Sequence, residues 1–356
     1  MKLKNIKIEK LFGQFDYDIE LNQEEGITIL TGPNGYGKTT VLNIVFDSDH
    51  RGTGYYNSLI FDKILLNFDN DDCSIIEKKY KDNREKWELI TTWAKKTPKL
   101  YFIKDQRLVS QVDKTPNYAP SQKQYENVPT IELYAREIRD TLSAIKNKEN
   151  NLMGQLSNSQ NQRYIECMPL SDRKYEDKFS LVMQKYNKLL DIGIYEEPLK
   201  SSDYTEKKFL TLFLLDLEKR ILLYDDIIPN ITLFNDLINA KELANKNIKI
   251  NFDNGFLAKS INNKNIALSR LSSGEQEQVI LLYELIFKTK NEAIVLIDEP
   301  ETSMHVAWQQ LFLKDLEQIG KLNSLSFLVA THSPDIIGDK LKWVVDLYEL
   351  SRRDAE

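Results

Sequence analysis

A glycine-rich loop followed by a lysine and two threonines is the feature that most constrains the fold of this chain. Residues 32–40 read GPNGYGKTT and fit the pattern G-x-x-x-x-G-K-[ST]. Apolar runs precede the loop at residues 26–30 and follow it at residues 41–46, which predicts a strand, the loop and a helix in that order. An incidental glycine turn before a helix would not need the strand in front. The pattern therefore predicts a phosphate-binding loop in an α/β fold, because backbone N–H groups and a helix N-terminus both face an anion there.

The side chains of this loop indicate which phosphate compound it binds. Lys38 is placed to bridge the β- and γ-phosphates of a nucleoside triphosphate, and Thr39 is placed to ligate Mg²⁺. We therefore expect ATP and Mg²⁺ as cofactors. The loop residues expected to contact ATP are Asn34, Gly35, Gly37, Lys38, Thr39 and Thr40.

A second motif follows much later in the chain, where five apolar residues at 293–297 end in Asp298 and Glu299. An uninterrupted apolar run suits a central parallel strand that is covered on both faces. Asp298 at its tip is expected to hold the metal, and Glu299 to polarise the attacking water as a general base. A strand that ends in a solvated acidic turn would look the same in isolation. The glycine loop supplies the context that favours the catalytic interpretation.

Three further segments narrow the type of nucleotide site. Residues 271–276 read LSSGEQ and precede an apolar stretch. Residues 327–333 predict an apolar strand that ends close to His332, and residues 101–107 predict a strand followed by Gln106. In chain order the five segments are the glycine loop, a glutamine, a serine–glycine signature, an Asp–Glu pair and a histidine.

This order of segments resembles that of the ABC-type ATPases. The resemblance implies that two ATPase heads pack head-to-tail as a homodimer or a higher multiple. Ser272 and Gly274 of one head would then cap the γ-phosphate that the glycine loop of the other head holds, as a second helix N-terminus aimed at an anion. It also implies that Gln106 contacts both ATP and the metal, and that His332 is the catalytic switch histidine.

Within these ATPases the chain resembles the SMC, RecF and OLD-like branch. The motifs are DEPETSMH at residues 298–305 and ATHSP at residues 330–334. The tracts at 308–310 and 337–340 are most similar to small ATPases of bacterial anti-phage systems such as PARIS and, more loosely, to those of Septu and of retrons. This resemblance implies a sensor or regulator of a separate toxic effector that is nuclease-like.

The chain departs from the family patterns at three places. Ser273 replaces the first glycine of the LSGGQ signature, and Glu275 replaces its glutamine. Residues 11–15 lack the arginine of the N-F-R-like run found near the phosphates in this branch, so no role is transferred to them. After His332 only 24 residues remain (356 − 332), so we expect any nuclease partner to be a separate polypeptide.

The pattern of apolar residues predicts three domains. Residues 1–111 would form the first half of the ATPase head, residues 112–245 an inserted helical lobe, and residues 246–356 the second half of the head. Antiparallel strands are expected at residues 59–68, 73–81 and 86–93, and helices at residues 131–156, 175–190 and 205–243 with a break at Pro229. No helical stretch sustains three heptads of apolar a and d positions, which favours a compact lobe over coiled-coil arms. The expected fold class is α/β, an ABC-type P-loop NTPase head with an antiparallel β-subdomain and an inserted helical lobe.

Composition bears on partners and location. The chain holds 48 Lys and Arg against 54 Asp and Glu, for a net charge of −6. Residues 110–250 hold 20 basic and 21 acidic residues, so charge gives no positive support for DNA binding, which usually shows a basic stripe. No apolar run approaches the roughly 18 residues of a membrane helix, and the two cysteines are too few for a disulfide framework. A cytoplasmic location without a membrane partner is therefore expected.

Two other functions remain open on the sequence. The first is a RecF-like ATPase that binds DNA directly in repair or recombination. The second is the ATPase subunit of a transporter, which the 165 residues between Gln106 and Leu271 (271 − 106) disfavour, because transporter subunits hold a much smaller helical segment there. Chromosome-structure ATPases hold a very long coiled coil in the same interval, so this chain is intermediate.

Overall fold

The computed structural model describes residues 2–49, 53–81, 86–103, 108–113, 125–198, 206–289 and 291–353. They form two units, one made of Met1–Arg107 with Leu281–Glu356 and the other of Leu108–Ile280. The predicted residue Gln106 lies outside the described residues. The second unit includes strands that the sequence assigned to the second half of the head, and the three-domain division stays a prediction.

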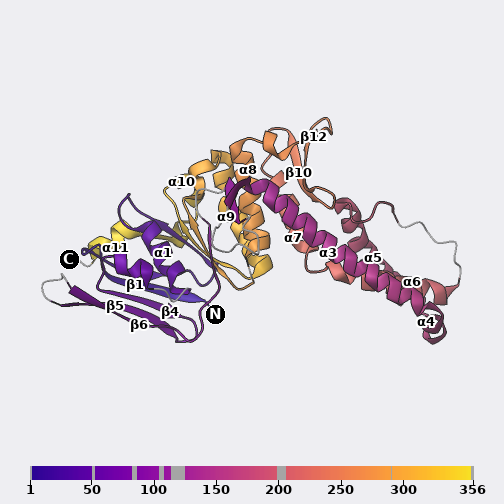
Figure 1. Cartoon of the computed structure of the whole chain (residues 1–356), viewed down its shortest axis with the longest axis horizontal. Helices are drawn as coiled ribbons and strands as arrows, with labels where there is room; N and C mark the ends of the chain where they lie inside the picture. Colours follow the sequence, from indigo (N-terminus) through magenta and orange to yellow (C-terminus); the bar gives the residue numbers. More distant parts are fainter. Residues whose placement is uncertain are drawn as a thin grey trace. The chain divides into compact units, whose positions relative to one another are not determined.

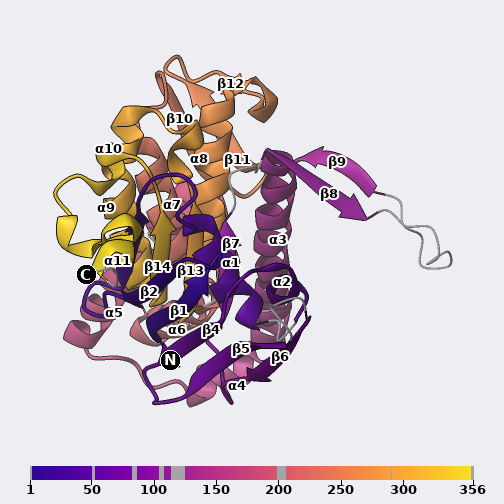
Figure 2. The ribbon, with the colours of Figure 1, turned by 90° about the vertical axis from the view of Figure 1, so that its left-hand side faces the viewer.

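A parallel sheet of five strands is the centre of the first unit (Figure 2). In spatial order its strands are β15 (Val344–Asp346), β3 (Ile27–Thr31), β14 (Ser326–Ala330), β13 (Ile294–Asp298) and β7 (Leu100–Ile103). The apolar runs β3, β13 and β14 are buried along almost their whole length, as expected for parallel strands covered on both faces. Because Asp298 pairs with Ala330 and Ala330 with Leu30, the carboxyl ends of the three strands meet at one edge.

A second, antiparallel sheet completes the layers of this unit. Its spatial order is β2 (Phe15–Glu20), β1 (Leu3–Leu11), β4 (Lys63–Phe68), β5 (Cys73–Lys81) and β6 (Lys86–Thr92). Helix α1 (Lys38–Asp49) packs between the two sheets, in one apolar cluster with residues of both. The consecutive residues Val41 and Leu42, and likewise Ile44 and Val45, are almost fully buried, so α1 is covered on more than one face.

Short helices and one long helix surround these sheets. The long helix α9 (Val306–Asn323) packs against β14 and against the π-helical turn η3 (Glu284–Lys288). The remaining elements of the first unit are α2 (Gly54–Ser58), η4 (Pro300–Ser303), α10 (Pro334–Ile337), η5 (Leu341–Trp343) and α11 (Leu347–Arg353). The short helices η4 and α10 directly follow β13 and β14, so they form the rim of the edge where the carboxyl ends meet.

The second unit is mainly helical. Helices α3 (Thr130–Asn158), α5 (Asp172–Ile192) and α6 (Lys207–Ile221) lie side by side, with α4 (Gln160–Glu166) at one end (Figure 1). Pro229 does not break a helix: α6 ends earlier, and Pro229 lies in the first turn of α7 (Ile228–Asn239), where a missing N–H is harmless. The other elements are η1 (Leu222–Tyr224), β8 (Val109–Asp113), β9 (Tyr125–Pro129), β10 (Lys246–Asn251), β11 (Gly255–Ser260), β12 (Asn265–Ile266), η2 (Leu268–Arg270) and the start of α8 (Ser273–Tyr283).

A buried carboxylate, that of Glu149 in α3, organises the interior of the helical unit. Its Oε1 accepts hydrogen bonds from the Tyr195 hydroxyl and from Arg220 Nε, both at 2.8 Å. Its Oε2 accepts from Lys146 Nζ at 3.0 Å and from the Tyr224 hydroxyl at 2.9 Å. Burial raises the pKa of Glu149, but these four hydrogen bonds outweigh it and hold the pKa below its usual value. The network fixes how α3, α6 and η1 pack.

The predicted fold class is confirmed. The chain is α/β, with a parallel sheet that carries the glycine loop, an antiparallel sheet beside it, and a mainly helical unit that lies between the two segments of the first unit in the sequence.

Candidate functional site

The glycine loop leaves β3 in a conformation that its glycines permit. The φ angles of Gly35 and Gly37 are +89° and +85°, in the left-handed region that other residues rarely adopt. A Cβ atom on Gly37 would also lie 3.0 Å from Leu11 Cδ2. The space beside Gly35 is open, and its neighbour Asn34 is exposed, so a ligand can approach the backbone of the loop directly.

Lys38 begins α1 and is almost fully buried, at 6% exposure. Its Nζ donates hydrogen bonds to the Gly32 carbonyl at 2.8 Å and to the Pro33 carbonyl at 3.3 Å, so the amine lies over its own loop. Burial lowers the pKa of Lys38, and the nearby carboxylates of Glu299 and Asp298 oppose that shift. The loop thus holds a cation at the point where phosphate oxygens would enter.

Thr39 and Asp298 meet across the unit although 259 positions separate them in the sequence. Thr39 Oγ1 donates a hydrogen bond of 3.1 Å to Asp298 Oδ1, which joins the start of α1 to the end of β13. A hydroxyl and a carboxylate are hard oxygen ligands of the kind that Mg²⁺ prefers, so this pair fits the predicted metal. Among the described residues, no three His, Cys, Asp or Glu side chains cluster to hold a metal.

Glu299 and His332 also lie together. The backbone of Glu299 is left-handed, with φ +43°, and its N–H donates to the Ala330 carbonyl at 2.9 Å. Glu299 Oε1 lies 3.9 Å from His332 Nε2, and both side chains are partly exposed. The turn after β13 and the turn after β14 therefore present an acid and an imidazole to the same space.

Glu301 is a site residue that the sequence analysis missed as a functional group. Its Oε1 accepts hydrogen bonds from Thr331 Oγ1 at 2.8 Å and from the His332 backbone N–H at 2.7 Å. Its Oε2 is buried and has no hydrogen-bond partner among the described residues. The second glutamate of the DEPE run was the available signal, but in the sequence it supported only the resemblance.

Aromatic side chains pack against Tyr36 of the glycine loop, and the sequence analysis did not predict them. The Tyr17 hydroxyl donates to the Tyr36 carbonyl at 2.8 Å. The Tyr36 ring lies 5.1 Å from that of Phe15 and 5.5 Å from that of Tyr348 between centroids. These contacts fix the middle of the loop. On its other side, the Thr40 hydroxyl is hydrogen-bonded to Tyr55.

The predicted signature residues lie in the helical unit. Ser272 precedes α8, where its Oγ accepts from the Glu275 N–H at 3.3 Å and its N–H donates to Glu275 Oε2 at 2.8 Å. This is a capping box, which leaves Gly274 in the first turn of the helix. Lys246 Nζ of β10 donates to both oxygens of Glu275, at 2.7 and 2.9 Å. The glutamate that replaces the signature glutamine therefore stabilises this turn.

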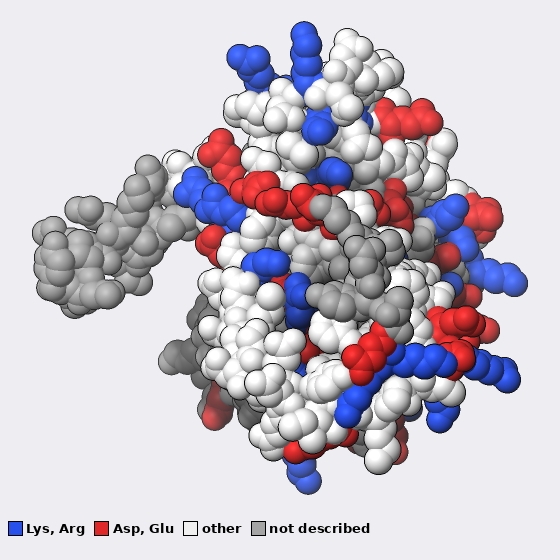
Figure 3. All heavy atoms as spheres, turned by 90° about the vertical axis from the view of Figure 1, so that its right-hand side faces the viewer, with Lys and Arg blue, Asp and Glu red and all other residues white. Residues whose placement is uncertain are grey.

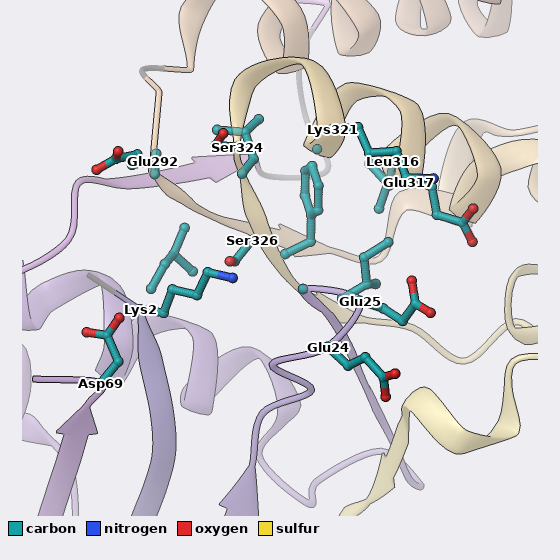
Figure 4. Close-up of a pocket in the computed structure, with 17 residues that line it drawn as sticks. Lys2, Glu24, Glu25, Asp69, Glu292, Leu316, Glu317, Lys321, Ser324 and Ser326 are labelled. Atoms are coloured by element: carbon teal, nitrogen blue, oxygen red, sulfur yellow. The ribbon is translucent and has the colours of Figure 1, made fainter.

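A further cavity, lined by described residues of the first unit, differs in charge from the candidate site. A cavity of about 480 Å³ lies at the opposite edge of the parallel sheet, beside Ile27 and Ile294 (Figure 4). Its charged lining is mostly acidic, including Glu24, Glu25 and Glu292, which would repel phosphates. On the face in Figure 3, Lys and Arg side chains are interspersed with Asp and Glu and form no continuous basic patch.

A family model described as an AAA ATPase domain matches residues 53–337, which is well over half of the chain, and the chain belongs to that family. It is also similar to the DNA replication and repair protein RecF of Chlorobium luteolum, at 27% identity over 194 residues. That match covers 53% of this chain and 45% of the RecF protein, so it spans less than half of the relative. The predicted SMC and RecF-like branch agrees with these findings.

Solved structures of Smc head domains are also similar to this chain. The Pyrococcus furiosus head, bound to the C-terminal domain of ScpA, is 13% identical with a TM-score of 0.43, covering 97% of this chain and 92% of that one. The Thermotoga maritima head is 10% identical with a TM-score of 0.40, covering 95% and 91%. Within the described residues, no helix is both long and apolar enough to cross a membrane.

Proposed function

We propose that this chain binds and hydrolyses ATP with Mg²⁺ at the carboxyl edge of the parallel sheet. The observation that carries the proposal is the contact between Thr39 and Asp298 beside the buried amine of Lys38. It joins the glycine loop to the acidic strand end, and Glu299 and His332 lie at the same edge.

Each side chain has a role in this proposal. Lys38 exchanges its loop carbonyls for the β- and γ-phosphate oxygens. Thr39 and Asp298 hold Mg²⁺, which when bound neutralises charge on the phosphate oxygens. Glu299 accepts the proton of the attacking water, and His332 orients the γ-phosphate beside it. Backbone N–H groups of the loop, including those of Gly35 and Gly37, complete the phosphate contacts.

The signature completes the site from a second copy of the chain. Ser272 and Gly274 lie at the N-terminus of α8, an end of a helix that favours an anion. We propose that they cap the γ-phosphate held by the partner copy, in a head-to-tail homodimer. Gln106 is proposed to contact ATP and Mg²⁺.

We propose that the chain acts in the cytoplasm. The ATPase dimer would act as sensor or regulator of a separate, nuclease-like effector in anti-phage defence, with the helical lobe holding the partner. The similarity to RecF supports a second candidate, an ATPase that binds DNA in repair or recombination. Binding of purified protein to duplex DNA that weakens steeply with salt would favour the second candidate. Co-purification of an effector without DNA binding would favour the first.

A mixing experiment tests the shared site. Lys38→Ala should abolish tight Mg·ATP binding in calorimetry, whereas Ser272→Arg should keep binding but lose hydrolysis. A mixed dimer of the two variants contains one site with both defects and one intact site. Mixing should therefore restore up to about half the activity per mixed dimer if the sites are independent.

The control is Ser180→Arg, which adds the same charge at an exposed position of α5 and should leave activity unchanged. Binding of Mg·ATP by Lys38→Ala within twofold of the unaltered chain would refute the phosphate site. Full activity in a stable monomer would refute the shared site.

A further inference from the structure

We propose that Glu301 is a positioning residue that holds the switch turn, Thr331 and His332, against the acidic turn after β13. The inference rests on the proposed ATP hydrolysis. Glu301 Oε1 accepts from two consecutive residues of this turn, the Thr331 hydroxyl at 2.8 Å and the His332 N–H at 2.7 Å. One carboxylate oxygen thus fixes both the side chain before His332 and the backbone of His332 itself.

The direction of these hydrogen bonds is determined by their neighbours. The Ser333 N–H donates to Thr331 Oγ1 at 3.0 Å, so the Thr331 oxygen is already an acceptor and its hydrogen is free to point at Glu301. Thr331 is fully buried, so water does not compete for the hydroxyl. Such a chain of hydrogen bonds strengthens its members and favours a single conformation of the turn.

The turn is held at three consecutive residues. The Glu299 N–H donates to the Ala330 carbonyl, and Glu301 accepts from the next two residues, Thr331 and His332. The Nε2 atom of His332 lies 3.9 Å from Glu299 Oε1. Glu301 therefore sets the separation of the proposed base and the switch histidine through the Thr331 hydroxyl and the His332 backbone.

Every hydrogen bond that the described residues make to the Glu301 carboxylate comes from this turn, because its Oε2 has no partner among them. An amide oxygen could accept the same two bonds. Glutamine should therefore replace Glu301, whereas alanine should release the turn. A displacement near 1 Å at a reacting group can lower a rate by about 100-fold.

The test measures the position of His332 separately from hydrolysis. The chain has three histidines, so selectively labelled imidazole groups give three NMR signals, and His332→Ala assigns one of them. Glu301→Ala should shift the His332 signal and lower kcat by about 10- to 100-fold, with KM for ATP within about twofold. Glu301→Gln should restore both the signal and kcat. Glu24→Ala, an exposed glutamate at the opposite edge of the sheet, is the matched control and should change neither.

An unmoved His332 signal in Glu301→Ala, or a Gln variant that behaves like the Ala variant, would overturn the proposal. Where Glu301→Ala does not fold, Glu301→Asp must shift the same signal relative to the unaltered chain, since its carboxylate is one methylene shorter, and Glu301→Gln must not. A shifted signal in a chain that does not hydrolyse ATP at all would leave Glu301 as the positioning residue and refute the proposed hydrolysis instead.

Discussion

The ion pair of half-buried Lys246 with buried Glu275 supports a quantitative prediction at the signature turn. Lys246 Nζ lies 2.7 Å from Glu275 Oε1, and the Glu275 side chain is 4% exposed against 23% for Lys246. Glu275 Oε2 also accepts the Ser272 N–H. Replacement by methionine, Lys246→Met, keeps the length of the side chain but removes the cation that balances a buried carboxylate.

Leaving a buried charge without its partner costs about 3–5 kcal/mol. Because Lys246 is partly exposed, water replaces some of its effect, and we expect a loss below that range, about 2–3 kcal/mol at pH 7. Both residues lie in the helical unit, and the thermal unfolding transition of Lys246→Met should move to lower temperature.

The pH dependence gives the sharper test. Burial raises the pKa of Glu275, but hydrogen bonds from Lys246 and Ser272 outweigh it and hold the pKa below the usual value. The unaltered chain therefore gains stability from Glu275 above the unfolded pKa of about 4.3 and loses it as the pH falls. Lys246→Met removes a hydrogen bond and a charge that lower this pKa, so the folded pKa of Glu275 should rise. The stability that Glu275 adds above the unfolded pKa should then shrink.

Thermal melts from pH 4 to pH 7 measure this difference. The destabilisation of Lys246→Met should grow as the pH rises. The control is Lys249→Met on the same strand, because the Lys249 amine donates to the Asp191 carbonyl and pairs with no carboxylate among the described residues. A loss in Lys246→Met that is equal at pH 4 and pH 7, or equal to that of the control, would refute the reasoning.

The remaining predictions concern catalysis and backbone space. Glu299→Gln should keep Mg·ATP binding in calorimetry. It should slow phosphate release by about 100-fold, the effect of losing a positioned base. Near-normal turnover would exclude Glu299 as that base. Gly255→Ala should destabilise the helical unit by more than about 3 kcal/mol in denaturant melts, since its Cβ would lie 1.8 Å from the Ala135 carbonyl oxygen at φ +72°. Gly154→Ala in open space on α3 should instead stabilise by about 0.5–1 kcal/mol, and similar effects at the two glycines would contradict the packing.

The local sequence determined those strands and helices whose defining residues are adjacent in the chain. The glycine loop follows its strand and starts its helix as predicted, because the apolar runs and the left-handed glycines act within a few residues of one another. The apolar run that ends at Asp298 is a parallel strand for the same reason. Helices expected at residues 131–156 and 175–190 are α3 and α5, within a few residues at each end.

Tertiary structure alone decided which distant groups meet. The hydrogen bond between Thr39 and Asp298 requires the parallel sheet, which joins residues from both ends of the chain. Glu301 gains its partners from the turn after β14, and nothing in its own segment indicates that contact. Similarly, the sequence shows Glu275 only as a replacement for the signature glutamine. The fold alone brings Lys246 of β10 beside it. Periodicity encodes which face of an element is buried, but a hydrogen bond between distant residues depends on the strand order that packing selects.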